Sequence, residues 1–114
     1  MQPEAERLLQ DILDSIQAIE GYLGEERNYF EFLAHRMMKR AIERELEIIG
    51  EAVRKLDSIA PDIAVSNKSK IIGTRNRVIH AYDAIDYEIL WGIIVRHIPK
   101  LKLEIETLIR EQSK

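Results

Sequence analysis

The spacing of hydrophobic residues along the chain predicts four helical segments. The first begins near Pro3, a residue suited to the first helical position, and ends at Gly21, with Gly24 close behind. Its apolar residues recur at steps of three and four, the period of a helix with one buried face. They are Ala5, Leu8, Ile12, Ile16 and Ile19.

The second segment reads as one long helix from about Asn28 to Ala60, ended by Pro61. Its main predicted stripe is Phe30, Leu33, Met37, Ala41, Ile48 and Ala52, widened by Met38, Ile42, Ile49, Val53 and Leu56. About thirty helical residues span ~45 Å at 1.5 Å per residue. That is longer than a compact domain of this size needs, so we expect a partner, most simply a second copy.

Two further helices follow a polar link over residues 61–67. One runs from about Lys68 to Tyr82, and Gly73 either bends it or marks its true start. The other begins after Asp83 or Asp86, since aspartate favours the N-cap. Its stripe is Leu90, Ile94, Ile98, Leu101, Ile105 and Leu108, and Pro99 within it predicts a kink or a break.

The predicted fold is therefore all-α, an antiparallel bundle of four or five helices in a single domain covering residues 1–114. Zero cysteines among 114 residues exclude a disulfide scaffold and a thiolate zinc site. Five acidic residues within the first twenty argue against a signal peptide, and no apolar run is long enough to cross a membrane. We expect a cytoplasmic protein.

Positive charge gathers in one stretch of a chain whose net charge is −3. Residues 63–82 hold no Asp or Glu and carry Lys68, Lys70, Arg75 and Arg77, so this stretch is +4 and the other 94 residues sum to −7. It is either a chance gap in a charge-rich sequence or a patch that attracts anions, most naturally phosphates.

The same stretch contains a cluster of reactive side chains, Arg75, Asn76, His80 and Tyr82. Arginine is a permanent forked cation that matches phosphate oxygens, and histidine transfers protons near neutral pH. On one helix, however, Arg75 and His80 lie about 140° apart, whereas Asn76 and Arg77 lie within about 60° of His80. Two copies of the helix facing each other would bring both groups to one cleft, a second indication of a dimer.

The pattern Arg75-x4-His80-x-Tyr82 resembles the signature of the HEPN domain superfamily, and more narrowly that of the HepT-like toxins. Ile49-Gly50-Glu51-Ala52 resembles a further stretch of that family, and Trp91 and Pro99 also fit. The resemblance covers nearly the whole chain.

The resemblance implies a homodimer with both motifs lining one cleft, and a metal-independent ribonuclease that needs no cofactor. His80 would be the acid/base, Arg75 the contact to the phosphate, and Asn76 the residue that orients the substrate or His80. The partner would be a nucleotidyltransferase antitoxin, which can attach AMP to Tyr82. Arg77, Lys68 and Lys70 lie outside the signature, and we assign them contacts to the RNA backbone.

Two other interpretations of the motif remain open. It could belong to a non-catalytic module that binds a nucleotide or RNA or docks the nucleotidyltransferase. It could also be a buried polar network that holds the dimer together.

Other polar residues have simpler interpretations. Glu43, Glu47 and Glu51 form an i, i+4, i+8 ladder, but arginines alongside favour a solvated, salt-bridged face over a metal site. Glu51 stays open because it falls in the family stretch. His35 and His97 are interpreted as structural or surface residues.

Overall fold

The computed structural model describes residues 2–80 and 86–112, and the side chains of all of these except residues 75–80. They form six α-helices and one π-helical segment. The helices are α1 (Pro3–Leu23), α2 (Tyr29–Ala34), α3 (Arg36–Ile59), α4 (Lys68–His80), α5 (Tyr87–Gly92) and α6 (Ile98–Gln112), and the π-helical segment is η1 (Ile93–His97).

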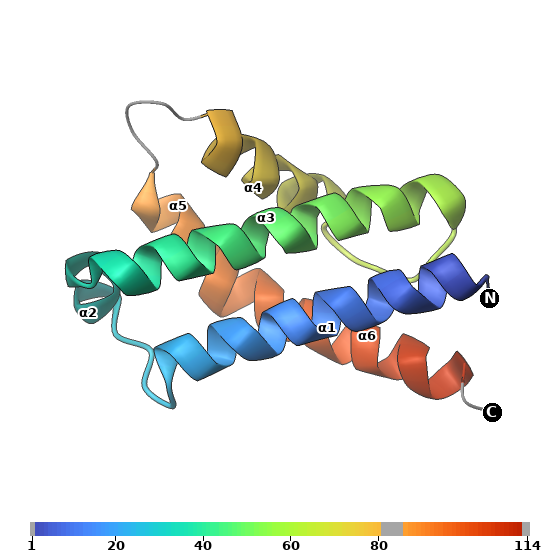
Figure 1. Cartoon of the computed structure of the whole chain (residues 1–114), viewed down its shortest axis with the longest axis horizontal. Coiled ribbons are helices and arrows are strands. Elements are labelled where there is room, and N and C mark those ends of the chain that lie inside the picture. Colours follow the sequence, from blue (N-terminus) through green and yellow to red (C-terminus); the bar gives the residue numbers. More distant parts are fainter. Residues whose placement is uncertain (1, 81–85, 113–114) are drawn as a thin grey trace.

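The helices form an antiparallel bundle, as the sequence predicts. α3 runs antiparallel to α1 and to α4, and α6 lies along α1 (Figure 1). Because α5, η1 and α6 follow one another without a break, they form one long element that crosses the bundle. The described residues contain no strand, so the all-α fold class is confirmed.

Predicted apolar stripes form much of the core. Every predicted stripe residue of α1 is buried, and so is every one from Leu90 to Leu108. Asp86 caps α5 as predicted, since its Oδ1 accepts hydrogen bonds from the backbone N–H groups of Glu88 and Ile89. Because these stripes meet between antiparallel helices, one continuous core holds the bundle together.

The first helix ends later than predicted. α1 passes through Gly21 and ends at Leu23, and Gly24 is the capping residue. Gly24 has φ +72°, a left-handed conformation that glycine adopts without a steric penalty, and its N–H donates to the Glu20 carbonyl.

The prediction of one helix from Asn28 to Ala60 is wrong, because the helix is interrupted at His35. His35 has an extended backbone, with φ −100° and ψ 90°, and its ring Nδ1 accepts the N–H of Met38. Its side chain therefore caps α3 in the way Asn28 caps α2. The excess length of this predicted helix was one of the two arguments for a dimer, and the interruption at His35 removes that argument.

The break also corrects the predicted stripe. Phe30 and Met37 are 78% and 76% exposed. Of the predicted main stripe within α3, only Ala52 is buried. The other buried apolar side chains of α3 form the neighbouring row, which the sequence indicated only as a widening, with Leu46 in addition. They are Ile42, Leu46, Ile49, Val53 and Leu56.

Pro99 neither breaks the helix nor marks its end. The chain stays helical from residue 87 to 112, and the disturbance takes the form of the π turn just before the proline. There the Ile98 N–H donates to the Ile93 carbonyl, five residues back. Because proline lacks an N–H and crowds the carbonyl four residues earlier, a widened turn is a way to accommodate it.

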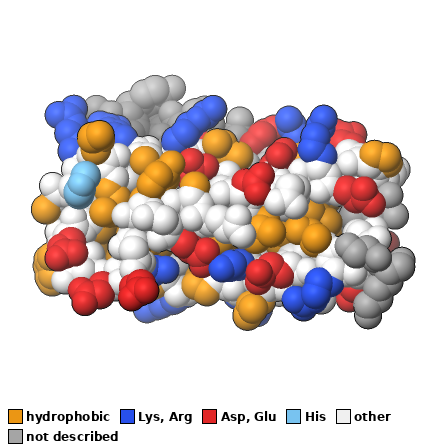
Figure 2. Space-filling view, turned by 60° about the horizontal axis from the view of Figure 1, so that its bottom comes forward, with side chains coloured by type: hydrophobic (Ala, Val, Ile, Leu, Met, Phe, Trp, Pro, Cys, Tyr) orange, Lys and Arg blue, Asp and Glu red, His pale blue; other side chains and the backbone are white. Residues whose placement is uncertain are grey.

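The surface mixes charges of both signs. Figure 2 shows acidic and basic side chains interleaved over one face, with hydrophobic side chains between them. Within the described part of the chain, no helix is long and apolar enough to cross a membrane.

Candidate functional site

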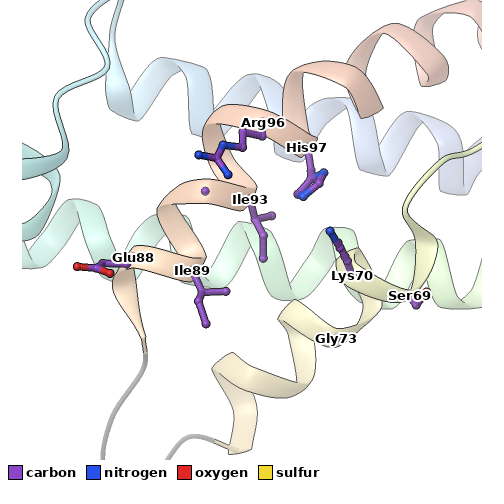
Figure 3. Close-up of a pocket in the computed structure, with 9 residues that line it drawn as sticks. Ser69, Lys70, Gly73, Glu88, Ile89, Ile93, Arg96 and His97 are labelled. Carbon is purple, nitrogen blue, oxygen red and sulfur yellow. The ribbon is translucent and has the colours of Figure 1, made fainter.

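A cleft of about 600 Å³ lies between α4 and the α5–η1 element. We call it the α4–η1 cleft. α4 contributes one wall and α5 with η1 the other (Figure 3). The lining residues are Ser69, Lys70 and Gly73 of α4, Glu88, Ile89 and Gly92 of α5, and Ile93, Arg96 and His97 of η1.

One end of the cleft is cationic. Lys70 and His97 point toward one another across it, and Arg96 belongs to the same turn as His97 (Figure 3). Lys70 and Arg96 are exposed, and within the described part neither forms an ion pair with a carboxylate. The positive charge here is therefore not neutralised by the described chain.

His97 is held toward its neutral form. Burial is the main reason that its pKa is lowered, and the nearby cations Lys70, Arg96 and Lys100 lower the pKa further. A neutral imidazole beside two exposed cations can accept a proton when an anion arrives, because the anion offsets the repulsion between the charges.

The opposite end of the cleft lies toward the motif. Glu88 and Ile89 line it there, and α4 continues from Gly73 toward His80. At about 100° per residue, positions 76 and 80 share the side of the α4 backbone on which Gly73 lies, whereas position 75 falls about 160° away. By register alone, positions 76 and 80 therefore lie on the same side of the α4 backbone as Gly73, and position 75 lies on the other side.

The predicted site residues are described only in part. Arg75, Asn76, Arg77 and His80 belong to the last turns of α4, and their side chains lie outside the described part of the structure. Tyr82 lies outside the described residues altogether.

The two predicted lysines differ in their surroundings. Lys70 lines the cleft, whereas Lys68 is engaged elsewhere. The Lys68 Nζ lies 2.8 Å from the Asp57 carboxylate on α3 and 3.0 Å from the Pro61 carbonyl. Lys68 therefore ties the start of α4 to the end of α3.

The glutamate ladder of α3 is only partly the solvated face that its sequence predicts. Arg44 pairs with Glu47 at 3.2 Å and Arg54 with Glu51 at 2.7 Å, which fits the prediction. Glu43, in contrast, is 4% exposed.

The buried carboxylate of Glu43 has few partners. Arg40 approaches its Oε1 at 3.8 Å, and its Oε2 accepts no hydrogen bond within the described part of the chain. Burial raises the pKa of Glu43 most strongly, while Arg40, Lys39 and the Tyr87 hydroxyl lower that pKa. Lys39 also lies 4.6 Å from the centre of the Tyr87 ring.

The sequence did not indicate that His97 lines a cleft. Next to an apolar stripe and without a motif partner, it reads as a structural or surface residue, and the structure places it in the cleft opposite Lys70. The one available signal was Pro99 two residues later, since a proline inside a helix predicts an irregular turn before it. Among the described residues, no three His, Asp or Glu side chains are grouped so as to hold a metal ion.

Comparisons with known proteins agree on one family. The family model described as "Ribonuclease HepT-like" matches residues 12–108. The chain is 36% identical over 104 residues to a candidate RNase of Methanocaldococcus jannaschii, covering 90% of this chain and 94% of that protein. It is 33% identical over 104 residues to the "Probable ribonuclease HepT" of Thermococcus cleftensis, covering 88% and 91%. No solved structure matches the chain.

Proposed function

Because the chain belongs to the HepT-like ribonuclease family, we propose that it is a metal-independent endoribonuclease, the toxin of a toxin–antitoxin pair. The observation that carries this proposal is the family match over residues 12–108, which includes Arg75-x4-His80-x-Tyr82. The cleft supports it, because α4, the helix that bears Arg75 and His80, forms one of its walls.

The proposed reaction needs only groups of the protein and of the RNA. His80 removes the proton of a ribose 2′-hydroxyl, and the oxygen attacks the adjacent phosphorus. The bond from phosphorus to the 5′-oxygen breaks, leaving a 2′,3′-cyclic phosphate and, after that oxygen takes up a proton, a 5′-hydroxyl. Arg75 stabilises the negative charge on the phosphorane-like transition state, and Asn76 orients the substrate or His80. The substrate is tRNA or mRNA.

We propose that the active form is a homodimer. The support is the register of α4, in which positions 75 and 80 diverge by about 140°. A second copy facing the first would bring Arg75 of one chain to the cleft that holds His80 of the other. Size measurement in solution tests the state, and mixing Arg75→Ala with His80→Ala protein tests the sharing. Shared sites regain part of the activity in mixed dimers, whereas separate sites stay inactive.

The proposed partner is a nucleotidyltransferase antitoxin that acts on the toxin in the cytoplasm. It neutralises the nuclease by transferring AMP to the Tyr82 hydroxyl, with ATP as donor and pyrophosphate as leaving group. Intact-mass measurement after co-expression with such a partner tests this step. Tyr82→Phe should block the added AMP.

The experiment that tests the nuclease incubates purified protein with total tRNA in excess EDTA. Wild-type protein should give discrete fragments with cyclic phosphate ends, and His80→Ala should lower the rate by about 10²- to 10⁴-fold. His35→Asn is the matched control, because it removes an imidazole outside the α4–η1 cleft and keeps a side chain that can cap α3.

The outcome separates the functional classes. Uncut RNA in every lane, from protein whose mass shows no AMP on Tyr82, contradicts the nuclease and favours a binding module. Equal cleavage by His80→Ala and wild type contradicts the role of His80.

A further inference from the structure

The cationic end of the α4–η1 cleft holds three groups that the motif does not include. Lys70 comes from α4, while Arg96 and His97 come from η1. All three line the same cleft as Gly73, which lies one turn along α4 toward the motif. Arg96 and His97 are consecutive residues of the π-helical segment, and both line this wall.

The charges along the cleft are separated. Glu88 is the acidic residue among the described lining, and it lies nine residues before His97, about 13 Å along the helix axis. Lys100 on α6 adds a further cation near His97. A ligand with negative charge is therefore favoured at the Lys70 end and disfavoured at the Glu88 end.

The walls also leave room for close approach. Gly73 and Gly92 sit inside helices on opposite walls, and a Cβ added to either would meet nothing within 4 Å. Glycine in a helix costs about 1 kcal/mol relative to alanine, and no group among the described neighbours requires it at either place. Open space at both positions fits a cleft that admits a ligand backbone.

We propose that Lys70, Arg96 and His97 form a phosphate-binding subsite for the RNA backbone, separate from the phosphate that is cut. The subsite rests on the proposed ribonuclease function. Ten residues of α4 separate Lys70 from His80, on the order of 15 Å along the axis. The subsite therefore holds a phosphate a few nucleotides away from the scissile bond, and it sets where the strand lies in the cleft.

The subsite also makes RNA binding depend on pH. The groups that face His97 are Lys70 from α4, Arg96 from η1 and Lys100 from α6, and all three are cations that disfavour its protonation. A bound phosphate reverses this effect and raises the pKa of His97. Affinity then rises as pH falls through the range between the free and bound pKa, by about tenfold for each unit of difference.

A binding experiment tests the subsite without relying on cleavage. The probe is a fluorescein-labelled 2′-O-methyl hexaribonucleotide, which lacks the 2′-hydroxyl nucleophile. Anisotropy is recorded at several KCl concentrations and from pH 5.5 to 8. Lys70→Ala should weaken binding about five- to tenfold and lower the salt slope by about 0.7, the value for one lost single-strand phosphate contact. Lys55→Ala removes the same charge from an exposed site on α3 and should change neither quantity.

His97→Gln provides the second readout. It should abolish the tightening of binding below neutral pH, and in the wild type the ring-proton titration of His97 should move to higher pH when the probe is added. A purely structural His97 would not respond to the probe. Because Lys70 is exposed and unpaired with any described carboxylate, Lys70→Ala keeps the test valid if His97→Gln fails to fold.

The possible results point in separate directions. Equal losses for Lys70→Ala and Lys55→Ala, an unchanged His97 titration, or no binding of the probe by wild type each overturn the subsite. If the wild type cuts tRNA and the subsite variants bind normally, the subsite fails and the nuclease stands. If the subsite variants lose binding and the wild type cuts nothing, the nuclease fails and the subsite stands as a binding site.

Discussion

The two sides of α4 differ in how their side chains are packed and paired. On the side packed against α3, Ile71 and Thr74 are buried, and the Thr74 hydroxyl donates to the Lys70 carbonyl at 2.9 Å. On the cleft side, Lys70 is exposed without a described counter-ion, and Gly73 faces open space. On the packed side the side chains are buried or hydrogen-bonded within the chain. The cleft side carries a charge without a described counter-ion and leaves open space. Unsatisfied groups on a helix whose other face is well packed indicate a binding surface rather than poor folding.

The largest effect on stability should come from shortening a buried side chain on the packed side of α4. Ile71 is 3% exposed, so Ile71→Ala should lower the free energy of unfolding by about 2 to 4 kcal/mol through lost burial and a cavity. Urea denaturation measures this loss. Ile72, only partly buried, is the matched control, and Ile72→Ala should cost clearly less. Equal costs would mean that the buried and the partly buried position of α4 do not differ in packing.

Filling the cleft should separate stability from activity. Gly73→Leu replaces a poor helix former with a good one in open space, so stability should hold or rise by up to about 1 kcal/mol. Cleavage of tRNA should fall at least tenfold, because the leucine occupies the path of the substrate. Gly73→Ala serves as control with a smaller side chain and a smaller loss. Full activity in Gly73→Leu would show that RNA does not enter the cleft.

Replacing Glu43 tests whether its buried, ionised carboxylate destabilises the fold. Because burial raises its pKa in the folded state, folding favours the protonated carboxyl, and the charge destabilises the protein above the unfolded pKa. Glu43→Gln should therefore raise the Tm by several degrees at pH 7, and the gain should vanish below about pH 4. Thermal melts at both pH values measure it. A lower Tm at pH 7 would mean that Arg40 and Lys39 outweigh the cost of burial.

The two lysines give the smallest and most closely matched contrast. Lys68 pairs with Asp57 at 2.8 Å across the α3–α4 contact, so Lys68→Ala should cost about 0.5 to 1 kcal/mol of stability. Lys70→Ala should leave stability within about 0.3 kcal/mol, since no described acid pairs with it. Chemical denaturation of both variants at low and high salt measures the two stability costs. The reverse order of costs would exchange the roles assigned to the two residues.

Much of the fold follows from apolar spacing and helix caps. The stripes of α1 and α6 and the cap at Asp86 depend on local patterns, and the structure confirms them. The break at His35 could not be predicted, because histidine is an unusual cap and the apolar pattern runs on across it. For α3 two adjacent rows were apolar, and only packing against α1 and α4 decides which of them is buried.

The site was predictable only where it is written as a motif. Arg75, His80 and Tyr82 stand at a recognisable spacing in the sequence; Arg75 and His80 belong to α4, and their role stays a prediction. His97 and Lys70 are 27 residues apart, and their meeting depends on how two helices pack. No local pattern contains that information.

The π turn has a consequence for how such chains vary in length. It amounts to one residue inserted into the phase of an otherwise continuous helix, and removing one residue from Ile93–His97 would restore an α turn. Because the widened turn holds its extra residue within a single turn, that deletion would leave α5 and α6 in nearly the same phase, whereas a deletion within a regular part of the helix would rotate one side by about 100°. Trp91, whose ring centre lies 5.1 Å from that of Phe32, would keep this contact when the residue is removed from η1. The link over residues 61–67 contains no helix, so this link and η1 are two places where a change of one residue would leave the phase of the helices intact.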